Sequence, residues 1–287
     1  MKRLITLIIT SATILCSCSR LDVNEFGTSL AENNLKGKVK TVKLSIYKAT
    51  KKFGELKPGS LSEDALFHPL STGYSFSFYG SGYYAGAICK QTYNNDGMIS
   101  SERWYNEKKK IYKETEYTYK NGFLLETNST YKSSLKYSYL PDNIYNEKYS
   151  YDKSGRVVAD TVYKDTSVFM TTLYEYSENT ITYCYDNKKN VVKFENGRPS
   201  MLISYDSVGN ETGTTRYNNH GFETSYDGKV SIEYDYNEYF DPISKTEDID
   251  KYTFSYEYDK KKNWTKRITY KDGEPIYIEE REITYFE

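Results

Sequence analysis

The sequence predicts an all-β protein built as an antiparallel meander of hairpins, and three observations support this prediction. The chain contains 33 tyrosines, and tyrosine favours strands. A short phrase recurs in which Tyr is followed by Asp, Asn or Lys, one or two polar residues, and then Gly or Asn. Such residues supply the positive φ angles that hairpin turns need. Beside these turns, side chains alternate with the period of two that is typical of a half-buried strand.

The clearest examples of the phrase lie at Tyr93–Gly97, Tyr119–Gly122, Tyr151–Gly155, Tyr205–Gly209, Tyr217–Gly221 and Tyr270–Gly273. Pairs of tyrosines two positions apart accompany them, at 117/119, 149/151, 174/176, 183/185, 234/236 and 256/258. Each pair must share one face of its strand. Because Leu, Ile, Val and Phe are few, we expect tyrosine rings to supply much of the buried area of a thin, repeated sheet. The repeated hairpins predict an extended or curled sheet.

The first 17 residues are typical of a targeting segment. Lys2 and Arg3 form a basic start, and the apolar run from Leu4 to Leu15 is shorter than the roughly 20 residues of a membrane span. The following Leu15-Cys16-Ser17-Cys18 resembles the bacterial lipobox. Cys18 fits the lipidated position, whereas Cys16 would follow the bulky Leu15. An ordinary secretory signal or a short N-terminal anchor remains an alternative.

The lipobox resemblance implies cleavage before Cys18 and attachment of a lipid to its thiol. The predicted location is therefore the cell envelope, at the outer membrane of a Gram-negative bacterium, with the periplasmic or surface face left open. The predicted organisation is a signal peptide at 1–17, a tether at 18–34 and a β domain at 35–287. Residues 54–87 interrupt the repeat with a stretch rich in Gly, Ser and Tyr, which predicts an insertion.

The composition and the motifs argue against several functions. The formal net charge of −1 gives no basic footprint for nucleic acid. The two histidines, His68 and His220, are not spaced as metal ligands, so neither a metal site nor a cofactor is predicted. No nucleophile elbow or phosphate-binding loop occurs, and no catalytic residue is assigned. Glu279, Glu280 and Glu282 are interpreted as the solvated face of a last strand.

Aromatic platforms are the one positive indication of a binding function, because exposed Tyr and Trp can stack on sugars or contact proteins. Packing is the competing interpretation for any aromatic residue at a repeated position. The candidate binding residues are Trp104, Trp264, Tyr74, Tyr79, Tyr83 and Tyr84.

The Tyr-Asp-x-x-Gly phrase resembles the YD repeat of RHS-type proteins. Residues 34–40 and 256–267 look like segments of YD-repeat lipoproteins, and the resemblance covers about residues 34–287. It implies an architecture of wound hairpins. Large RHS proteins enclose a C-terminal toxin, but this short chain shows no cargo domain or self-cleaving protease segment, so toxin delivery is not expected.

The sequence therefore predicts an envelope-anchored lipoprotein that acts as a non-enzymatic interaction or scaffold module. Its partners would be a membrane, through Cys18, and a protein or glycan, but no nucleic acid. The alternatives are a secreted carbohydrate-active hydrolase, which needs two carboxylates in a cleft, and a structural outer-membrane assembly factor.

Overall fold

The computed structural model describes residue 30 and residues 33–62, 87–132 and 143–287, and every regular element in these ranges is a β-strand. The prediction of an all-β antiparallel meander is confirmed. The strands are β1 (Val39–Lys52), β2 (Glu55–Leu61), β3 (Ile88–Tyr93), β4 (Ile99–Tyr105), β5 (Ile111–Lys120), β6 (Phe123–Tyr131), β7 (Asn143–Tyr151), β8 (Val157–Lys164), β9 (Ser167–Ser177), β10 (Thr180–Tyr185), β11 (Lys188–Glu195), β12 (Arg198–Tyr205), β13 (Glu211–Tyr217), β14 (Glu223–Asp227), β15 (Ser231–Tyr236), β16 (Pro242–Glu247), β17 (Asp250–Tyr258), β18 (Trp264–Lys271) and β19 (Glu274–Tyr285).

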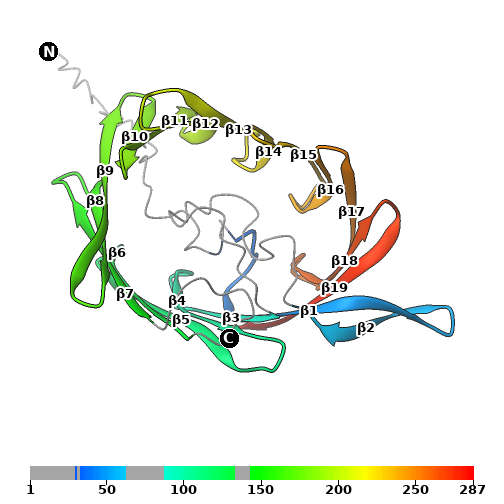
Figure 1. The fold of residues 1–287 in the computed structure, drawn as a ribbon. Coiled ribbons are helices and arrows are strands. Elements are labelled where there is room, and N and C mark those ends of the chain that lie inside the picture. The colour runs from blue at the N-terminus through cyan, green and yellow to red at the C-terminus, as the bar shows by residue number, and fades with distance from the viewer. Residues whose placement is uncertain (1–29, 31–32, 63–86, 133–142) are drawn as a thin grey trace, which may run out of the picture.

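The sheet closes on itself through β1 (Figure 1). Each strand from β3 to β19 pairs with its successor, and β1 pairs with β3 along Thr41–Ser45 and with β19 along Val39–Lys48. Within the described residues the ring therefore contains 18 strands. The remaining strand, β2, pairs with the second half of β1 in a hairpin that projects from the ring.

The predicted extended sheet is thus wrong, because the chain forms a closed barrel. Local sequence patterns specify each hairpin, but they do not specify the pairing of Thr41 with Thr284, which joins residues from the two ends of the chain. Closure removes the unpaired edges that an extended sheet would expose to water and to other chains. Part of the predicted insertion, residues 55–61, is strand β2, and residues 63–86 lie outside the described ranges.

The recurring phrase forms a turn that is fixed by its Asp or Asn side chain rather than by its glycine alone. In the turn after β12, Oδ1 of Asp206 accepts hydrogen bonds from the backbone N–H groups of Val208 (3.0 Å) and Asn210 (2.9 Å). Next to this turn, the pairing of β12 with β13 shifts in register between Ser204 and Tyr205. The same pair of bonds recurs at Asn94, Asn106, Asp152, Asn218, Asn237 and Asp259. The repeat is therefore a repeated side-chain-to-backbone cap.

The inner face of the barrel carries the apolar and aromatic core residues, together with a few buried charged groups. Val42, Leu44 and Ile46 of β1 share one face and pack with Leu35, and this N-terminal segment lies inside the ring in Figure 1. The strand register places all six predicted tyrosine pairs on this inner face. A first core cluster surrounds β1 and contains Trp104 and Trp264, and a second lies on β8–β12 around Ile181.

The outer face is polar where β1 pairs with β19. The hydroxyls of Thr41 and Thr284 are 2.7 Å apart there, and Lys43 forms an ion pair with Glu282 at 2.5 Å. The Lys43 side chain is 40% exposed and that of Glu282 is 71% exposed. Threonine and paired charges thus face outwards on β1 and β19. Among the described residues, no helix is long and apolar enough to cross a membrane.

The barrel has two rims, which we name by the chain termini. The terminal rim is the end at which β1 begins and β19 ends. The distal rim is the opposite end, where β1 continues into β2. Because neighbouring strands are antiparallel, the turns after β8, β12 and β16 also lie at the distal rim, while those after β3, β15 and β17 lie at the terminal rim.

Candidate functional site: the tyrosine-lined inner face

The tyrosines of the inner face form ladders that run across neighbouring strands. Tyr174 of β9 and Tyr183 of β10 have ring centroids 6.0 Å apart, and Tyr183 and Tyr185 are stacked at 6.5 Å. Tyr256 and Tyr258 lie 5.8 Å apart on β17. Such ring pairs add roughly 0.5–1.5 kcal/mol each beyond the burial of their area.

Many phenol hydroxyls on this face are satisfied by the protein. The hydroxyl of Tyr256 donates to the carbonyl of Pro242 (2.6 Å), and that of Tyr258 lies 3.0 Å from Oδ2 of Asp241. Tyr151 similarly donates to the carbonyl of Leu124. These bonds fix the rings against the wall, since a buried hydroxyl needs a partner.

One group of polar side chains lies beside the first core cluster. The indole N–H of Trp104 donates to Oε1 of Glu102 (2.6 Å), and Nζ of Lys113 lies 3.6 Å from the same oxygen. Gln91 donates to the other oxygen of Glu102 (3.0 Å), and the hydroxyl of Tyr93 donates to Gln91 (2.8 Å). Both oxygens of the Glu102 carboxylate are therefore engaged by neighbouring side chains.

A second group consists of two buried arginines. Both nitrogens of the Arg267 fork donate to the carboxylate of Glu279, and the Thr269 hydroxyl adds a bond of 3.2 Å. The guanidinium of Arg281 lies 3.5 Å from the centroid of the Trp264 ring. Burial lowers the pKa of Arg281, and the nearby charge of Asp241 opposes this effect. Stacking on an indole is a favourable position for a desolvated guanidinium.

A third group is a pair of carboxyls, the half-buried Glu147 on β7 and the fully buried Asp160 on β8. Their side chains are in hydrogen-bond contact, and the hydroxyls of Thr127 (3.3 Å) and Tyr174 (2.7 Å) donate to them. No donor reaches Oδ1 of Asp160, which is 0% exposed.

Burial raises the pKa of Glu147 to about 7, and the neighbouring charge of Asp160 adds to the effect. Burial also raises the pKa of Asp160 to about 6, against the hydrogen bond from Tyr174. Two neighbouring carboxyls cannot both ionise cheaply. The hydrogen bond with Glu147 lowers the pKa of Asp160, so Glu147 has the higher pKa of the two.

The two predicted tryptophans lie in the wall of the barrel and not on its surface. Trp104 is 1% exposed and Trp264 is 2% exposed, and both belong to the first core cluster. Their positions match the packing interpretation that competed with binding. Tyr74, Tyr79, Tyr83 and Tyr84 lie outside the described residues, as do Cys18 and His68.

Two further cysteines and His220 have simple positions. Cys89 is buried on the inner face and Cys184 is exposed, and both thiols are free. His220 occupies a turn, where its ring lies 4.2 Å from that of Phe240. In the described part of the chain, no group of three or more His, Cys, Asp and Glu residues could hold a metal ion.

Sequence reasoning missed the charged side chains of the inner face. It placed Glu279 with Glu280 and Glu282 on a solvated face, but Glu279 is buried against Arg267 while Glu282 faces outwards. The period of two was a usable signal, because residues 279 and 280 must lie on opposite faces of one strand. In the same way, Glu147 shares a face with Tyr149, which is two positions away.

Comparisons with known proteins do not identify a family. No family model matches the chain, and no curated protein is similar to it in sequence. A porin-like protein from Bacteroides uniformis is similar over 87% of this chain and 98% of its own, at 7% identity and a TM-score of 0.37. Two crystal structures of TcdB2-TccC3, one with Cdc42 and one without the hypervariable C-terminal region, match 66% of this chain at 12% identity, with TM-scores of 0.27 and 0.25.

The chain spans 14% of the length of the TcdB2-TccC3 chains. All three TM-scores are below 0.5, so these likenesses carry no conclusion about function. The resemblance to YD-repeat, RHS-type lipoproteins was wrong, because no family model matches and the listed likeness with the greater coverage, 87% of the chain, is to a porin-like protein. The Tyr-Asx phrase marks a capped turn beside a tyrosine face, and the capped turns at Asn106, Asn237 and Asp259 form without glycine.

The barrel agrees in a coarse sense with the predicted location. Closed antiparallel barrels with an even number of strands are typical of bacterial outer-membrane proteins, so the fold is consistent with an outer membrane. The faces, however, are reversed relative to a lipid-embedded barrel, which carries an apolar band on its outside. Here tyrosine lies inside, and outward pairs such as Lys43–Glu282 and Lys266–Glu257 (3.0 Å) face the surroundings.

Proposed function

We propose that the chain is an envelope lipoprotein, anchored through Cys18, whose barrel stands in water and acts as a non-enzymatic binding module. The observation that carries this proposal is the division of the wall into a polar outer face and a tyrosine-lined inner face. Charged side chains at the midplane of a bilayer cost about 2–4 kcal/mol each on the lipid face of a barrel. A tethered barrel in water avoids this cost.

The inner face is proposed as the contact surface for a protein or glycan partner. Half-buried rings such as Tyr176 and Tyr185 border the second core cluster, so they combine a fixed position with accessible ring area. Rigid aromatic rings of this kind provide much of the contact energy in protein interfaces.

The inner charges support binding rather than hydrolysis. Glycoside hydrolysis needs carboxyls separated by about 5 Å or about 6.5–9.5 Å. Glu147 and Asp160 are instead in hydrogen-bond contact, and Glu102 and Glu279 are bound to cationic side chains. No specific observation favours the alternative of an assembly factor.

Lipidation is tested by metabolic labelling with a clickable fatty acid. Cys18→Ala should abolish the label, and the matched Cys16→Ala variant should keep it. Continued labelling of the Cys18→Ala chain would refute the anchor. To test whether the barrel stands in water, the chain after Cys18 is placed behind an ordinary cleavable secretory leader. The proposal predicts a soluble protein, whereas a protein that stays in the membrane after an alkaline carbonate wash would contradict it.

Binding is tested by crosslinking and pull-down from intact cells, followed by measurement with the purified partner. Tyr185→Ala should weaken capture, because it removes an accessible ring from the inner face. Thr182→Ala is the matched control on the outer face of the same strand, β10. Equal capture by both variants would reject the inner face as the contact surface.

A further inference from the structure

Exposed apolar side chains are concentrated at one rim of the barrel. In the described ranges, six of the eight large apolar residues that are exposed lie at the distal rim, in turns or within the first three residues of a strand that begins there. They are Phe53, Ile144, Val168, Phe169, Val208 and Ile249. The other two are Leu173, on the outer wall, and Ile243, towards the terminal rim. Single exposed apolar residues are common, but such a bias towards one end of a molecule is not.

Phe53 is the most unfavourable of these residues for a protein surface in water. It forms the tip of the β1–β2 hairpin, its side chain is fully exposed (103%), and its φ angle is +54°. Left-handed positions in the other two-residue turns are filled by Asn or Asp, as at Asn121 and Asp165. A bulky residue is rare in this conformation. The chain therefore holds an aromatic ring in water at a position where Asn or Gly would be more stable.

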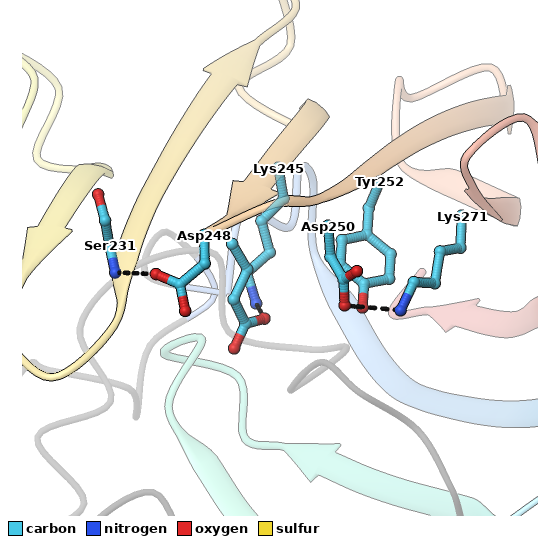
Figure 2. A network of polar contacts seen from close by, with 7 residues as sticks. Ser231, Lys245, Asp248, Asp250, Tyr252 and Lys271 are labelled. Atoms are coloured by element: carbon cyan, nitrogen blue, oxygen red, sulfur yellow. Dashed lines mark hydrogen bonds and ion pairs between the residues drawn. The ribbon is translucent and has the colours of Figure 1, made fainter.

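Asp248 and Asp250, the two neighbours of Ile249 in the sequence, are held by polar contacts (Figure 2). Asp248 accepts a hydrogen bond from the backbone of Ser231 (2.8 Å), and Asp250 binds the ammonium of Lys271 (2.6 Å). These bonds fix both neighbours of Ile249, whose own side chain is 91% exposed. These contacts explain how the turn is held, but not why an isoleucine stands at its tip.

Val208 is the third tip. It is 79% exposed in the turn whose Asp206 cap was described above, and its position in the phrase is filled by Asp96 or Ser154 in other turns. The capped turn would hold a polar residue equally well. Phe53, Val208 and Ile249 project from turns that are separated around the ring, so they form separate apolar points rather than one patch.

Separated apolar tips fit a fluid surface better than a protein partner, which needs a contiguous packed contact. Each of two tips has lysine close in sequence, Lys52 beside Phe53 and Lys251 near Ile249, and both lysines are exposed. Apolar side chains flanked by lysine are typical of segments that lie in the interface of an anionic bilayer.

The anchor proposed above would allow this contact. Eleven residues lie between Cys18 and Leu30, and a fully extended chain of that length reaches about 40 Å. Leu30 is held at the terminal rim by a bond from its N–H to the carbonyl of Gly97 (2.9 Å). A strand of eight residues such as β18 spans roughly 27 Å, so the tether is long enough for either rim to meet the membrane.

We propose that the distal rim rests on the lipid bilayer and inserts Phe53, Val208 and Ile249 into its interface. The barrel then stands on the membrane with its polar wall in water. This inference goes beyond the proposed anchor, which supplies only proximity, and it is tested by a separate readout.

The test uses the complete lipidated chain in vesicles of phosphatidylethanolamine and phosphatidylglycerol. In a Cys184→Ser background, a polarity-sensitive fluorophore is attached to Ile249→Cys or Val208→Cys. The matched control is Ser154→Cys, in an exposed turn at the terminal rim, and a second control is Glu282→Cys on the outer wall. We expect a blue shift at the two tips and loss of most of their emission when the lipids carry a quencher, but neither change at Ser154 or Glu282.

Three outcomes would overturn the proposal. Tip probes that behave like the Ser154 probe would show that the rim does not touch lipid. Quenching at Glu282 as well would show that the barrel is embedded in the bilayer. Tip probes that are water-exposed in vesicles but shielded in intact cells would point to a protein partner. Failure of the anchor is distinguished by the labelling of Cys18.

The Phe53→Asn variant separates a loss of membrane contact from a loss of folding. Because asparagine tolerates the left-handed conformation, this variant should melt at the same temperature as the wild type or higher. It should nevertheless reduce the quenching, by the quencher lipids, of a fluorophore attached to Ile249→Cys. Unchanged quenching in a stable Phe53→Asn variant would count against the role of the tip.

Discussion

Replacing Glu147 by glutamine should change how the stability of the barrel depends on pH. Glu147 is half-buried beside Asp160, and desolvation raises its pKa from 4.5 to about 7. A carboxyl whose pKa is raised by folding stabilises the folded state fully below about pH 4.5, and this contribution is lost as the pH rises through 7. The difference between the two pKa values corresponds to roughly 3 kcal/mol.

The Glu147→Gln variant should not lose this stability. The amide has nearly the same shape as the carboxyl and carries no charge at any pH. For a domain of this size, about 3 kcal/mol corresponds to a shift of roughly 6–12 °C in melting temperature. We therefore expect the melting temperature of the variant to rise relative to the wild type by about this amount between pH 4.5 and pH 8.

The assay is thermal unfolding followed by circular dichroism at four pH values. The matched control is Glu126→Gln, on the outer face of the neighbouring strand β6, which should follow the wild type. Glu223, whose pKa burial also raises to about 7, remains in both proteins and cancels in the comparison. If the melting temperatures of the wild type and Glu147→Gln changed in parallel with pH, the raised pKa of Glu147 would be refuted.

Three further predictions concern the stability of the wall. Arg267→Ala should lower the free energy of unfolding by about 3–5 kcal/mol, because it leaves the buried Glu279 without its partner, and denaturant titration measures this loss. Trp104→Phe keeps an aromatic ring but removes the donor to Glu102, so chemical unfolding should show a loss of about 1–3 kcal/mol, and an unchanged midpoint would contradict the assigned bond. Asn263→Ala removes the bonds that hold the N-terminal segment at Lys36, so hydrogen exchange should accelerate there while β10 stays protected.

The sequence predicted the elements of this fold better than their assembly. The tyrosine pairs and capped turns are local signals, and each was found where the pattern placed it. Closure depends on the pairing of Val42 with Ile283, a contact between distant residues that has no local signature. An extended sheet and a closed barrel therefore share the same hairpin pattern.

The candidate site was only partly predictable for a related reason. Alternation shows that Trp104 shares a face of β4 with Glu102, but it does not show whether that face is open or covered. In the structure it is covered by the first core cluster, so the indole packs. The Glu147–Asp160 contact needs the register of β7 against β8, which becomes visible only when the strands are paired.

The measurement that tests the account most directly is a disulfide across the seam of the barrel. Thr41 and Thr284 are paired between β1 and β19, and their hydroxyl oxygens are 2.7 Å apart on the outer face. In a Cys184→Ser background, Thr41→Cys with Thr284→Cys should form a disulfide that speeds migration in a non-reducing gel, whereas Thr41→Cys with Thr171→Cys should not. A seam pair that stays reduced under oxidising conditions, although both thiols react with a maleimide, would contradict the closed barrel.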